Sequence, residues 1–449
     1  MVTKSLNWPR PTIQISYFQY QLPTRLIHYR RCSDTLSSFS SDRALARSSS
    51  FIYSSDMTIL SIETSCDETA VSLVEATGDF PDASYEILGN ALFSQIDIHR
   101  EYGGVFPALA KREHTATLVP MLEKAVTESG IETESVTECD ATQSKRLTEL
   151  LEREPGLAEA LINFHNQHGV PAVDVIAVTA GPGLEPALWV GVNFAKALAY
   201  LWNIKMIPVN HMEGHVLASI FDVEEDDKLT PIPFPAMALL ISGGHTELVL
   251  MKDWVQDEKV GGTRDDSVGE AFDKVARLIG LPYPGGPEIS KLAAEARKAN
   301  LPPFKDDLPR PMLTSGDLDF SFSGLKTAVR YVVQDKELSD TDKQALARDF
   351  EDCVRDVLIA KTKAAIDAHG AQTLIIGGGV SANQFLMSEF KRHFLASHPD
   401  MNVYTPGPGL STDNSVMIAL AGHARLERAA NAAAATYIKA DGNRSLASE

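Results

Sequence analysis

A strand–turn–strand pattern occurs at two widely separated places in this chain, and it constrains the fold more than any other feature. The first unit is TILSIETSCDETAVSLVEA (58–76), with its polar turn at 65–69. The second is AMALLISGGHTELVLM (236–251), with its turn at 243–246. In both units, short apolar runs flank a few polar or glycine residues, which predicts a β-hairpin. Two such hairpins far apart in one chain predict two lobes of similar build.

A second pattern, strand–glycine turn–helix, also occurs twice. DVIAVTA leads through Gly-Pro-Gly (181–183) into the apolar helix pattern of 184–202, and TLIIGGGVSANQFLMSEFKRHF (373–394) has three glycines at its strand end. Such a turn lets a ligand approach the backbone and the positive start of a helix, although a tight turn alone explains any single case. Together with the hairpins, these turns predict an α/β nucleotide-binding fold. We expect the actin-like arrangement, in which two lobes each offer a hairpin turn to phosphates across a central cleft.

The boundary between the two lobes falls in an acidic and proline-rich stretch. DVEEDDK (222–228) and PIPFP (231–235) have the composition of a solvated loop. We therefore expect lobe I at 57–230 and lobe II at 231–410. Within lobe I, residues 128–172 are polar and carry two weak helical patterns, which we interpret as a surface insertion. Residues 431–449 are expected to form a tail.

The composition of this 449-residue chain is that of a globular protein, with 44% hydrophobic and 22% charged residues. No apolar run reaches the length of a transmembrane helix, so we expect no membrane partner. The four cysteines are scattered without a C-x-x-C pair, which argues against a disulfide framework and favours a reducing compartment. Because the net charge is −19, an RNA partner would need a local basic contact. Lys111, Arg112, Lys326 and Arg330 are candidates, although an ordinary surface charge is the favoured explanation of each.

The first 56 residues differ from the rest of the chain. They are rich in serine and arginine and contain few acidic residues. This composition is typical of a mitochondrial transit peptide, and it predicts a matrix location. A disordered tail is the alternative. Met57 stands where the ordered pattern begins, so it is a second candidate start, which would give a cytosolic form.

The stretch HMEGH (211–215) contains two histidines four residues apart. On a helix, His211 and His215 lie on one face, one turn apart. Glu213 lies roughly 200° around from His211, on the opposite face. In the zinc-protease motif H-E-x-x-H the glutamate acts as general base beside the metal, so Glu213 is badly placed for that chemistry. The pair is thus either a two-histidine metal site or two histidines of a structural helix.

Nine segments, taken in order, resemble one family, the tRNA N6-adenosine threonylcarbamoyltransferases, once described as glycoproteases. The leader points to its mitochondrial, single-chain branch. The segments span nearly all of 58–425, and nine matches in family order are far more specific than any one of them. They are SIETSCDETAV (61–71), HREYGGVFPALAKREH (99–114), VTAGPGL (178–184), NHMEGH (210–215), LLISGGHTEL (239–248), GEAFDKVARLIGLPYPGGP (269–287), DFSFSGLKTAV (319–329), LIIGGGVSAN (374–383) and STDNSVMIA (411–419).

The resemblance implies a metal site made of His211, His215 and Asp413. Two histidines and one carboxylate with open positions suit one divalent metal ion per subunit, zinc or iron. Asp413 follows the second lobe, so the helix expected at 411–430 must return to lobe I. The metal would then lie in the cleft.

The resemblance also implies a substrate, threonylcarbamoyl-AMP, supplied by a separate synthase. The turn at 242–246 would bind its phosphate through backbone N–H groups. Asp273 would accept hydrogen bonds from the ribose hydroxyls. The implied substrate-binding residues are Ser242, Gly243, Gly244, His245, Thr246, Asp273, Gly286, Glu288 and Asn383.

The implied reaction is acyl transfer to the exocyclic amine of the adenosine beside the tRNA anticodon. Asp67, Glu68 and His114 are the candidates to take the amine proton, and the sequence does not choose among them. tRNA is the implied partner, and this branch of the family is expected to work as a homodimer. Ala108 and the dipeptide Glu185–Pro186 depart from the family pattern, which leaves the details around them open.

Other classes of function remain as alternatives. A metalloprotease shares the histidine pair but lacks a base on the right face. A non-catalytic family paralogue, a sugar kinase of the same fold class or an actin-like filament protein would not be expected to carry the histidine pair with a distal aspartate.

Overall fold

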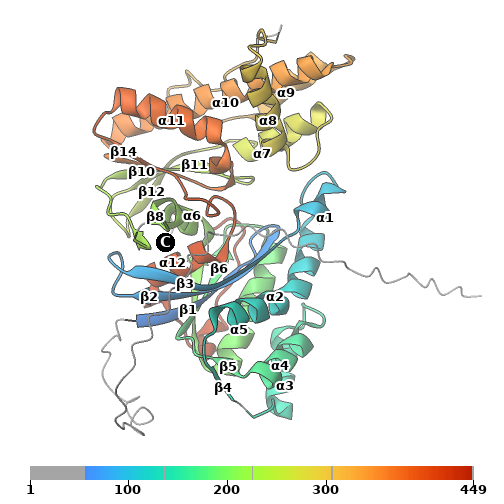
Figure 1. The fold of residues 1–449 in the computed structure, drawn as a ribbon, viewed down its shortest axis with the longest axis vertical. Coiled ribbons are helices and arrows are strands. Elements are labelled where there is room, and N and C mark those ends of the chain that lie inside the picture. Colours follow the sequence, from blue (N-terminus) through green and yellow to red (C-terminus); the bar gives the residue numbers. More distant parts are fainter. Residues whose placement is uncertain (1–55, 136, 225, 305–306, 447–449) are drawn as a thin grey trace, which may run out of the picture. The chain divides into compact units, whose positions relative to one another are not determined.

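The computed structural model describes residues 56–446, apart from 136, 225, 305 and 306 (Figure 1). The predicted leader, residues 1–56, lies outside the described residues except for Asp56. No helix in the described part of the chain combines the length and apolar character needed to cross a membrane.

The sheet of lobe I begins with an antiparallel meander that contains the first predicted hairpin. β1 pairs with β2 and β2 with β3, while β6 and β7 extend the other side of β1 in parallel. The strand order is β7-β6-β1-β2-β3-β9-β8. The bounds are β1 (Asp56–Glu63), β2 (Glu68–Thr77), β3 (Ser84–Ser94), β6 (Val175–Gly181), β7 (Lys205–Asn210), β8 (Phe221–Asp222) and β9 (Lys228–Leu229).

The sheet of lobe II repeats this topology. β10, β11 and β12 form an antiparallel meander, and β13 and β14 extend it in parallel on the far side of β10. The order β12-β11-β10-β13-β14 therefore matches β3-β2-β1-β6-β7 strand for strand. This duplication confirms the predicted actin-like α/β fold. The bounds are β10 (Ala236–Ile241), β11 (Thr246–Met251), β12 (Asp257–Gly262), β13 (Thr373–Gly377) and β14 (Asn402–Tyr404).

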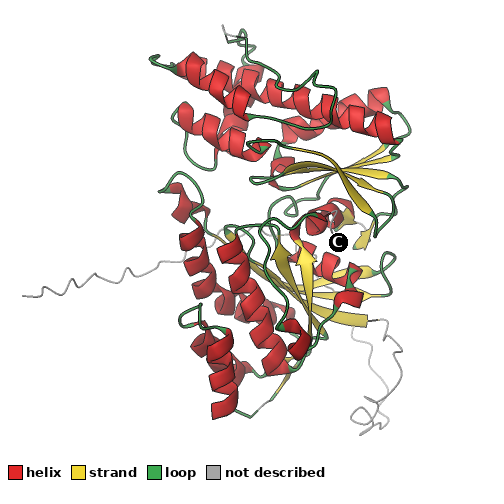
Figure 2. Ribbon diagram, turned by 180° about the vertical axis from the view of Figure 1, so that it is seen from behind, coloured by secondary structure: helices red, strands yellow, loops and turns green. Residues whose placement is uncertain are grey.

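Helices cover the outer face of each sheet (Figure 2). In lobe I, α2 packs on β2 and β3, and α5 packs on β6. In lobe II, the outer helices enclose a core built around Phe272, Phe350 and Phe390. The lobe I helices are α1 (Ile96–Arg100), α2 (Pro107–Ser129), α3 (Ala141–Leu150), α4 (Leu157–His168) and α5 (Glu185–Trp202). The outer helices of lobe II are α7 (Val268–Leu278), α8 (Gly285–Lys298), α9 (Ser323–Val333), α10 (Asp340–His369) and α11 (Gln384–Ser397), with the short η1 (Gly379–Ala382) preceding α11.

The segment interpreted as a surface insertion, 128–172, is packed more closely than that interpretation implies. Its two helices, α3 and α4, contribute Leu147, Leu161 and Phe164 to the core of lobe I. The two ends of the segment are joined by a short antiparallel strand pair, β4 (Thr133–Glu134) with β5 (Val170–Pro171). Most other residues of α3 and α4 are polar and face the solvent. The overall composition of the segment is therefore polar and does not reveal its few buried apolar side chains.

Two helices, α6 (His211–Ile220) and α12 (Ser415–Ala424), lie between the two sheets. Their apolar residues share one core cluster with Ile59 and Ala177 of lobe I and with Ala238 of lobe II. The helices cross at Gly214, where an added Cβ would lie only 3.0 Å from Met417 Cγ. The helix that follows Asp413 therefore packs on the lobe I strands and on α6 together.

The residues expected to form a tail, 431–449, fold back onto lobe I as far as they are described. After η2 (Leu426–Arg428) and α13 (Ala432–Ala435), Asp441 N–H donates to Ala180 O at 2.9 Å. Gly181 has φ +148°, and a Cβ there would lie 1.9 Å from Asp441 O. The glycine turn at 181–183 is thus occupied by the chain's own backbone, which explains its glycines without a ligand.

Candidate metal and substrate site

Three predicted metal ligands come together at the start of α6 and just before α12. Asn210 caps α6 by accepting Met212 N–H, and the four-residue spacing of His211 and His215 on this helix places both on one face. His215 Nε2 lies 3.1 Å from Asp413 Oδ1, and His211 Nε2 lies 3.4 Å from the same oxygen. All three donor atoms lie within 4.8 Å of one another. This spacing allows one ion to contact all three residues.

The position of His211 depends on a residue that sequence reasoning missed, Glu63. This fully buried glutamate ends β1 and accepts a hydrogen bond from His211 Nδ1–H at 3.0 Å. It also accepts from Thr179 Oγ1 at 2.6 Å and from the Ser65 backbone N–H. A carboxylate on the far nitrogen of a histidine fixes the tautomer and turns the other nitrogen toward a metal. The only sequence signal was a glutamate at the end of a buried strand.

The electrostatics of the cluster favour a positive charge at its centre. Burial lowers the pKa of His211, but the carboxylates of Glu63 and Asp413 outweigh burial and raise it to about 10. Burial alone would raise the pKa of Asp413, yet His211 and His215 hold it below its usual range. His215 has a pKa lowered by burial, and its Nδ1 finds no hydrogen-bond partner among the described residues. Two imidazoles and one carboxylate around a site that attracts cations fit a divalent metal.

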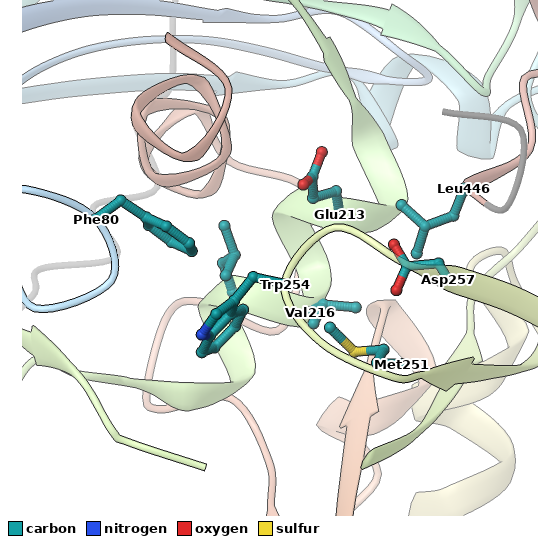
Figure 3. Close-up of a pocket in the computed structure, with 8 residues that line it drawn as sticks. Phe80, Glu213, Val216, Met251, Trp254, Asp257 and Leu446 are labelled. Carbon is teal, nitrogen blue, oxygen red and sulfur yellow. The ribbon is translucent and has the colours of Figure 1, made fainter. Parts of the chain in front are cut away.

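Glu213 lies on the opposite face of α6, as its helical spacing predicts. Its Oε1 lies 2.7 Å from Arg425 Nε, just after α12. Figure 3 shows Glu213 and Asp257 beside a mostly apolar recess. Glu213 therefore does not lie where the zinc-protease motif places its glutamate base. The other residues lining the recess are Phe80, Val216, Leu217, Met251, Trp254 and Leu446.

The β1–β2 turn brings two of the candidate proton acceptors next to Asp413. Asp67 and Glu68 are both buried, and burial raises the pKa of each carboxyl group. The negative charge of Asp413 raises both further. Across the cleft, burial and the charge of Asp67 raise the pKa of Tyr283 in lobe II. The carboxylate of Asp67 thus interacts electrostatically both with Asp413 and with Tyr283 of lobe II.

The third candidate, His114, is not brought to the cleft. It is fully buried behind the turn. Its Nε2 donates to Cys66 O at 3.0 Å, and its Nδ1 accepts from Thr69 Oγ1 at 2.8 Å. Burial lowers its pKa to about 4, so the ring is neutral at physiological pH. The structure gives His114 the role of supporting the turn that carries Asp67.

The predicted phosphate turn between β10 and β11 is only partly open. Gly243 and Gly244 are exposed, and an added Cβ at either would meet nothing within 4 Å. However, Ser242 N–H donates to His245 O at 2.9 Å, and Gly244 N–H donates to Ser242 Oγ at 3.3 Å. A phosphate here would have to replace the Ser242 hydroxyl as acceptor. Thr246 is buried and accepts Val268 N–H at 2.8 Å, so its hydroxyl supports the start of α7.

The remaining predicted substrate residues divide into two groups. Asp273 on α7 accepts Gly285 N–H at 2.7 Å, at the start of α8, where Gly286 and Glu288 also lie. Burial and, more weakly, the charge of Asp67 raise the pKa of Asp273 to about 6, although the Gly285 hydrogen bond opposes this.

Asn383 belongs to the second group, because its side chain is used within lobe II. Its oxygen accepts Leu386 N–H at the start of α11. Its amide nitrogen donates to Ser290 Oγ and to Glu351 Oε1, both at 2.8 Å. The structure thus gives Asn383 a capping role.

Comparisons with known proteins identify the family of this chain. A family model described as tRNA N6-adenosine threonylcarbamoyltransferase matches residues 86–143 and 152–420. The protein of that name from Burkholderia ambifaria is 42% identical over 388 residues, which cover 85% of this chain and 96% of the relative. The one from Burkholderia cenocepacia (strain HI2424) shows the same identity and coverage. A crystal structure of full-length HypF in the phosphate- and nucleotide-bound form has a TM-score of 0.46 at 13% identity, covering 82% of this chain and 46% of that chain. By the family match and the identity of these relatives, the chain belongs to the tRNA N6-adenosine threonylcarbamoyltransferase family.

Proposed function

We propose that this protein transfers a threonylcarbamoyl group from threonylcarbamoyl-AMP to N6 of the adenosine beside the anticodon in tRNAs that read ANN codons. The observation that carries the proposal is the convergence of three elements in a member of this family. The donor set His211, His215 and Asp413 lies next to the turn that carries Asp67. The charges of His211 and His215 also act on His245 of the β10–β11 turn, so that turn lies close to the same centre.

The reaction requires one bond to form and one to break. The N6 nitrogen attacks the carbamoyl carbonyl carbon, the bond from that carbon to the phosphate oxygen breaks, and AMP leaves with the electron pair. N6 must also lose a proton. We assign that proton to Asp67, because its raised pKa makes its carboxylate a stronger base and because its charge interacts with Asp413 on one side of the site and with Tyr283 of lobe II. Glu68, whose carboxyl group accepts a hydrogen bond from Ser94 Oγ, is the alternative.

A divalent ion, zinc or iron, would be held by His211, His215 and Asp413 and would supply a Lewis acid beside the substrate oxygens. Glu63 keeps the Nε2 of His211 directed at the same point as the Nε2 of His215. The two sheets and the packed helices α6 and α12 keep this arrangement rigid and exclude bulk water from its rear. Positioning and charge are the main requirements, since AMP is already a good leaving group.

The nucleotide half of the donor would lie on lobe II. The exposed backbone of Gly243 and Gly244 offers room for the phosphate. One oxygen of Asp273 is held at the start of α8, which leaves the carboxylate positioned to accept hydrogen bonds from ribose hydroxyls. Gly286 has no atom within 4 Å of an added Cβ, so the sugar can approach the backbone there.

The test is direct. Purified residues 57–449 loaded with zinc or iron are incubated with threonylcarbamoyl-AMP and an unmodified tRNA with an ANN-decoding anticodon, and N6-threonylcarbamoyladenosine is measured by mass spectrometry. The wild type should form product, and the double variant H211A/H215A should not. H168A, which removes a partly exposed histidine on α4, serves as the matched control and should retain activity. Absence of product from the folded, metal-loaded wild type would reject self-sufficient transfer.

Two further parts of the proposal concern the cell. The composition of residues 1–56 supports import into the mitochondrial matrix, and Met57 supports a second, cytosolic form. A fluorescent protein fused to residues 1–56 should enter mitochondria, and the same protein fused to residues 57–449 should stay outside.

A separate synthase would supply the substrate. The family resemblance supports a homodimer, which light scattering of the purified protein would detect as twice the chain mass.

A further inference from the structure

Two aromatic side chains are exposed on the short segment that joins β3 to α2. Tyr102 is 57% exposed and Phe106 is 52% exposed. Their ring centroids lie 5.4 Å apart with an interplanar angle of 57°. Neither ring contributes to the hydrophobic clusters of the described residues. Exposing two large rings next to each other costs free energy in water, so this pair needs a reason other than folding.

The segment lies beside the candidate site and is tied to both lobes. At its start, Gln95 N–H donates to Asp67 O at 2.8 Å. Arg100, at the end of α1 (Figure 1), donates from Nε to Tyr283 O at 3.0 Å. Tyr283 is two residues before Gly285, whose N–H holds Asp273. The segment that carries the aromatic pair is therefore hydrogen-bonded to the turn that holds Asp67 and to the loop just before Gly285, which holds Asp273.

A buried chain of hydrogen bonds holds the pair in place. His99 is fully buried, and its backbone oxygen accepts Tyr102 N–H at 3.0 Å while its Nδ1 accepts Phe106 N–H at 3.4 Å. Its Nε2 then donates to Gln95 Oε1 at 3.1 Å, and Gln95 Nε2 donates to His114 Nδ1 at 3.3 Å. His114 in turn donates to Cys66 O. One set of tautomers is compatible with these links, with Thr69 Oγ1–H and Gln95 Nε2–H sharing Nδ1 of His114 as acceptor. The backbone that carries the two rings and the inner turn therefore belong to one hydrogen-bonded scaffold.

The chemistry of this surface fits an unpaired nucleobase. Bases of RNA loops are recognised by stacking on aromatic rings, which is tolerant of sequence. The pair is preorganised, so little side-chain freedom is lost on binding. Residues 95–113 carry three basic side chains and three acidic ones, so this stretch is neutral in a chain whose net charge is −19. This stretch therefore repels phosphate less than the rest of the surface does.

We propose that Tyr102 and Phe106 form a stacking platform for an unpaired base of the tRNA loop that presents the acceptor adenosine. The proposal rests on the proposed function, because it assumes that a tRNA loop enters this site. The platform would hold a neighbouring base while the acceptor adenosine is turned toward Asp67.

The experiment measures tRNA binding directly, by fluorescence anisotropy with an end-labelled unmodified tRNA, using the metal-loaded protein. Y102A/F106A should bind about tenfold more weakly than the wild type, because about one base loses its stacking surface. Y102F/F106Y, which keeps both rings, should bind within about twofold of the wild type. Y437A is the matched control, since Tyr437 is 84% exposed and lies after α13, on another part of lobe I. Metal affinity, melting temperature and the salt dependence of binding should be unchanged in Y102A/F106A, because no charge is removed.

Each outcome decides the proposal. Wild-type affinity in Y102A/F106A, or an equal loss in Y437A, would overturn the platform while leaving the proposed function intact. A wild type that does not bind tRNA at all would overturn both. Light scattering on the same samples tests another occupant, a second copy of the chain. If Y102A/F106A becomes monomeric and regains full tRNA affinity at concentrations that restore the dimer, the rings belong to a subunit interface and the proposal is wrong.

Discussion

Replacing Glu63 by glutamine tests how far the proposed metal site depends on a residue outside its donor set. The carboxylate of Glu63 receives three hydrogen bonds, from His211 Nδ1, Thr179 Oγ1 and Ser65 N–H. A glutamine amide has nearly the same shape but offers only one oxygen, so its NH2 group must face at least one of these donors. Where it faces His211, the ring accepts at Nδ1 and carries its proton on Nε2, the atom that would bind the metal.

The expected loss of metal affinity lies at the lower end of the range for such partners. Removing an outer partner of a metal-bound histidine weakens binding about 10- to 100-fold, or roughly 1.4–2.7 kcal/mol. A second effect works in the opposite direction. In the metal-free protein, the charge of Glu63 also helps to hold a proton on His211, whose pKa is about 10, and that proton competes with the metal. E63Q removes part of this competition, so we expect a loss of about tenfold.

Two quantities from one calorimetric titration separate these effects. Titration of zinc in buffers of different ionisation enthalpy reports both the affinity and the number of protons released. The wild type should release about one proton at pH 7.5, and E63Q should release distinctly fewer. E154Q, which neutralises another buried glutamate of lobe I, is the control and should match the wild type. Unchanged affinity and unchanged proton release in a folded E63Q would refute the role assigned to Glu63.

Three other perturbations have defined outcomes. Because His211 of the metal-free protein holds its proton up to about pH 10, metal affinity should rise by up to tenfold per pH unit between about pH 6.5 and 9. Competition with a chelator measures this affinity, and an affinity that does not change with pH would contradict the prediction. R425M should lower the free energy of unfolding by about 3–5 kcal/mol, since it removes the ion-pair partner of the buried Glu213, and E213M/R425M should recover most of that loss. An equal loss of stability in the single and the double variant, measured by denaturant unfolding, would argue against the ion pair. The KM for threonylcarbamoyl-AMP should rise as the pH falls through about 6, where Asp273 takes up a proton, and this rise should disappear in D273N. If KM still rises at low pH in D273N, another group is responsible for the pH dependence.

Local patterns in the sequence were enough to predict the class of fold. The two hairpins, at 58–76 and 236–251, are encoded by apolar runs and turn residues that are close together in the chain. The faces of α6 follow in the same way from the geometry of the helix, which places His211 and His215 together and Glu213 opposite. Family resemblance added Asp413, which no local pattern identifies.

Long-range packing decided the environment of each of these residues. Glu63 is separated from His211 by 148 positions, and nothing in the sequence of β1 indicates that its last side chain orients this candidate ligand. His114 has the residue type of a proton acceptor, yet burial of its ring behind the β1–β2 turn removes it from the cleft. The glycine turn at 181–183 has the sequence of a ligand loop, but residues 441–442 of the same chain fill it.

The sequence by itself therefore predicted the two hairpins and the duplicated lobes, and through the family resemblance it named the candidate metal ligands. Periodicity and turn chemistry act over a few residues, so they can be interpreted from the chain alone. Only the tertiary structure decided which buried group orients His211, which carboxylates lie beside Asp413 and which glycine turn stays open at 243–244. The physical reason is that hydrogen-bond partners and pKa shifts depend on burial and on neighbours, and these are set by the packing of segments far apart in the sequence.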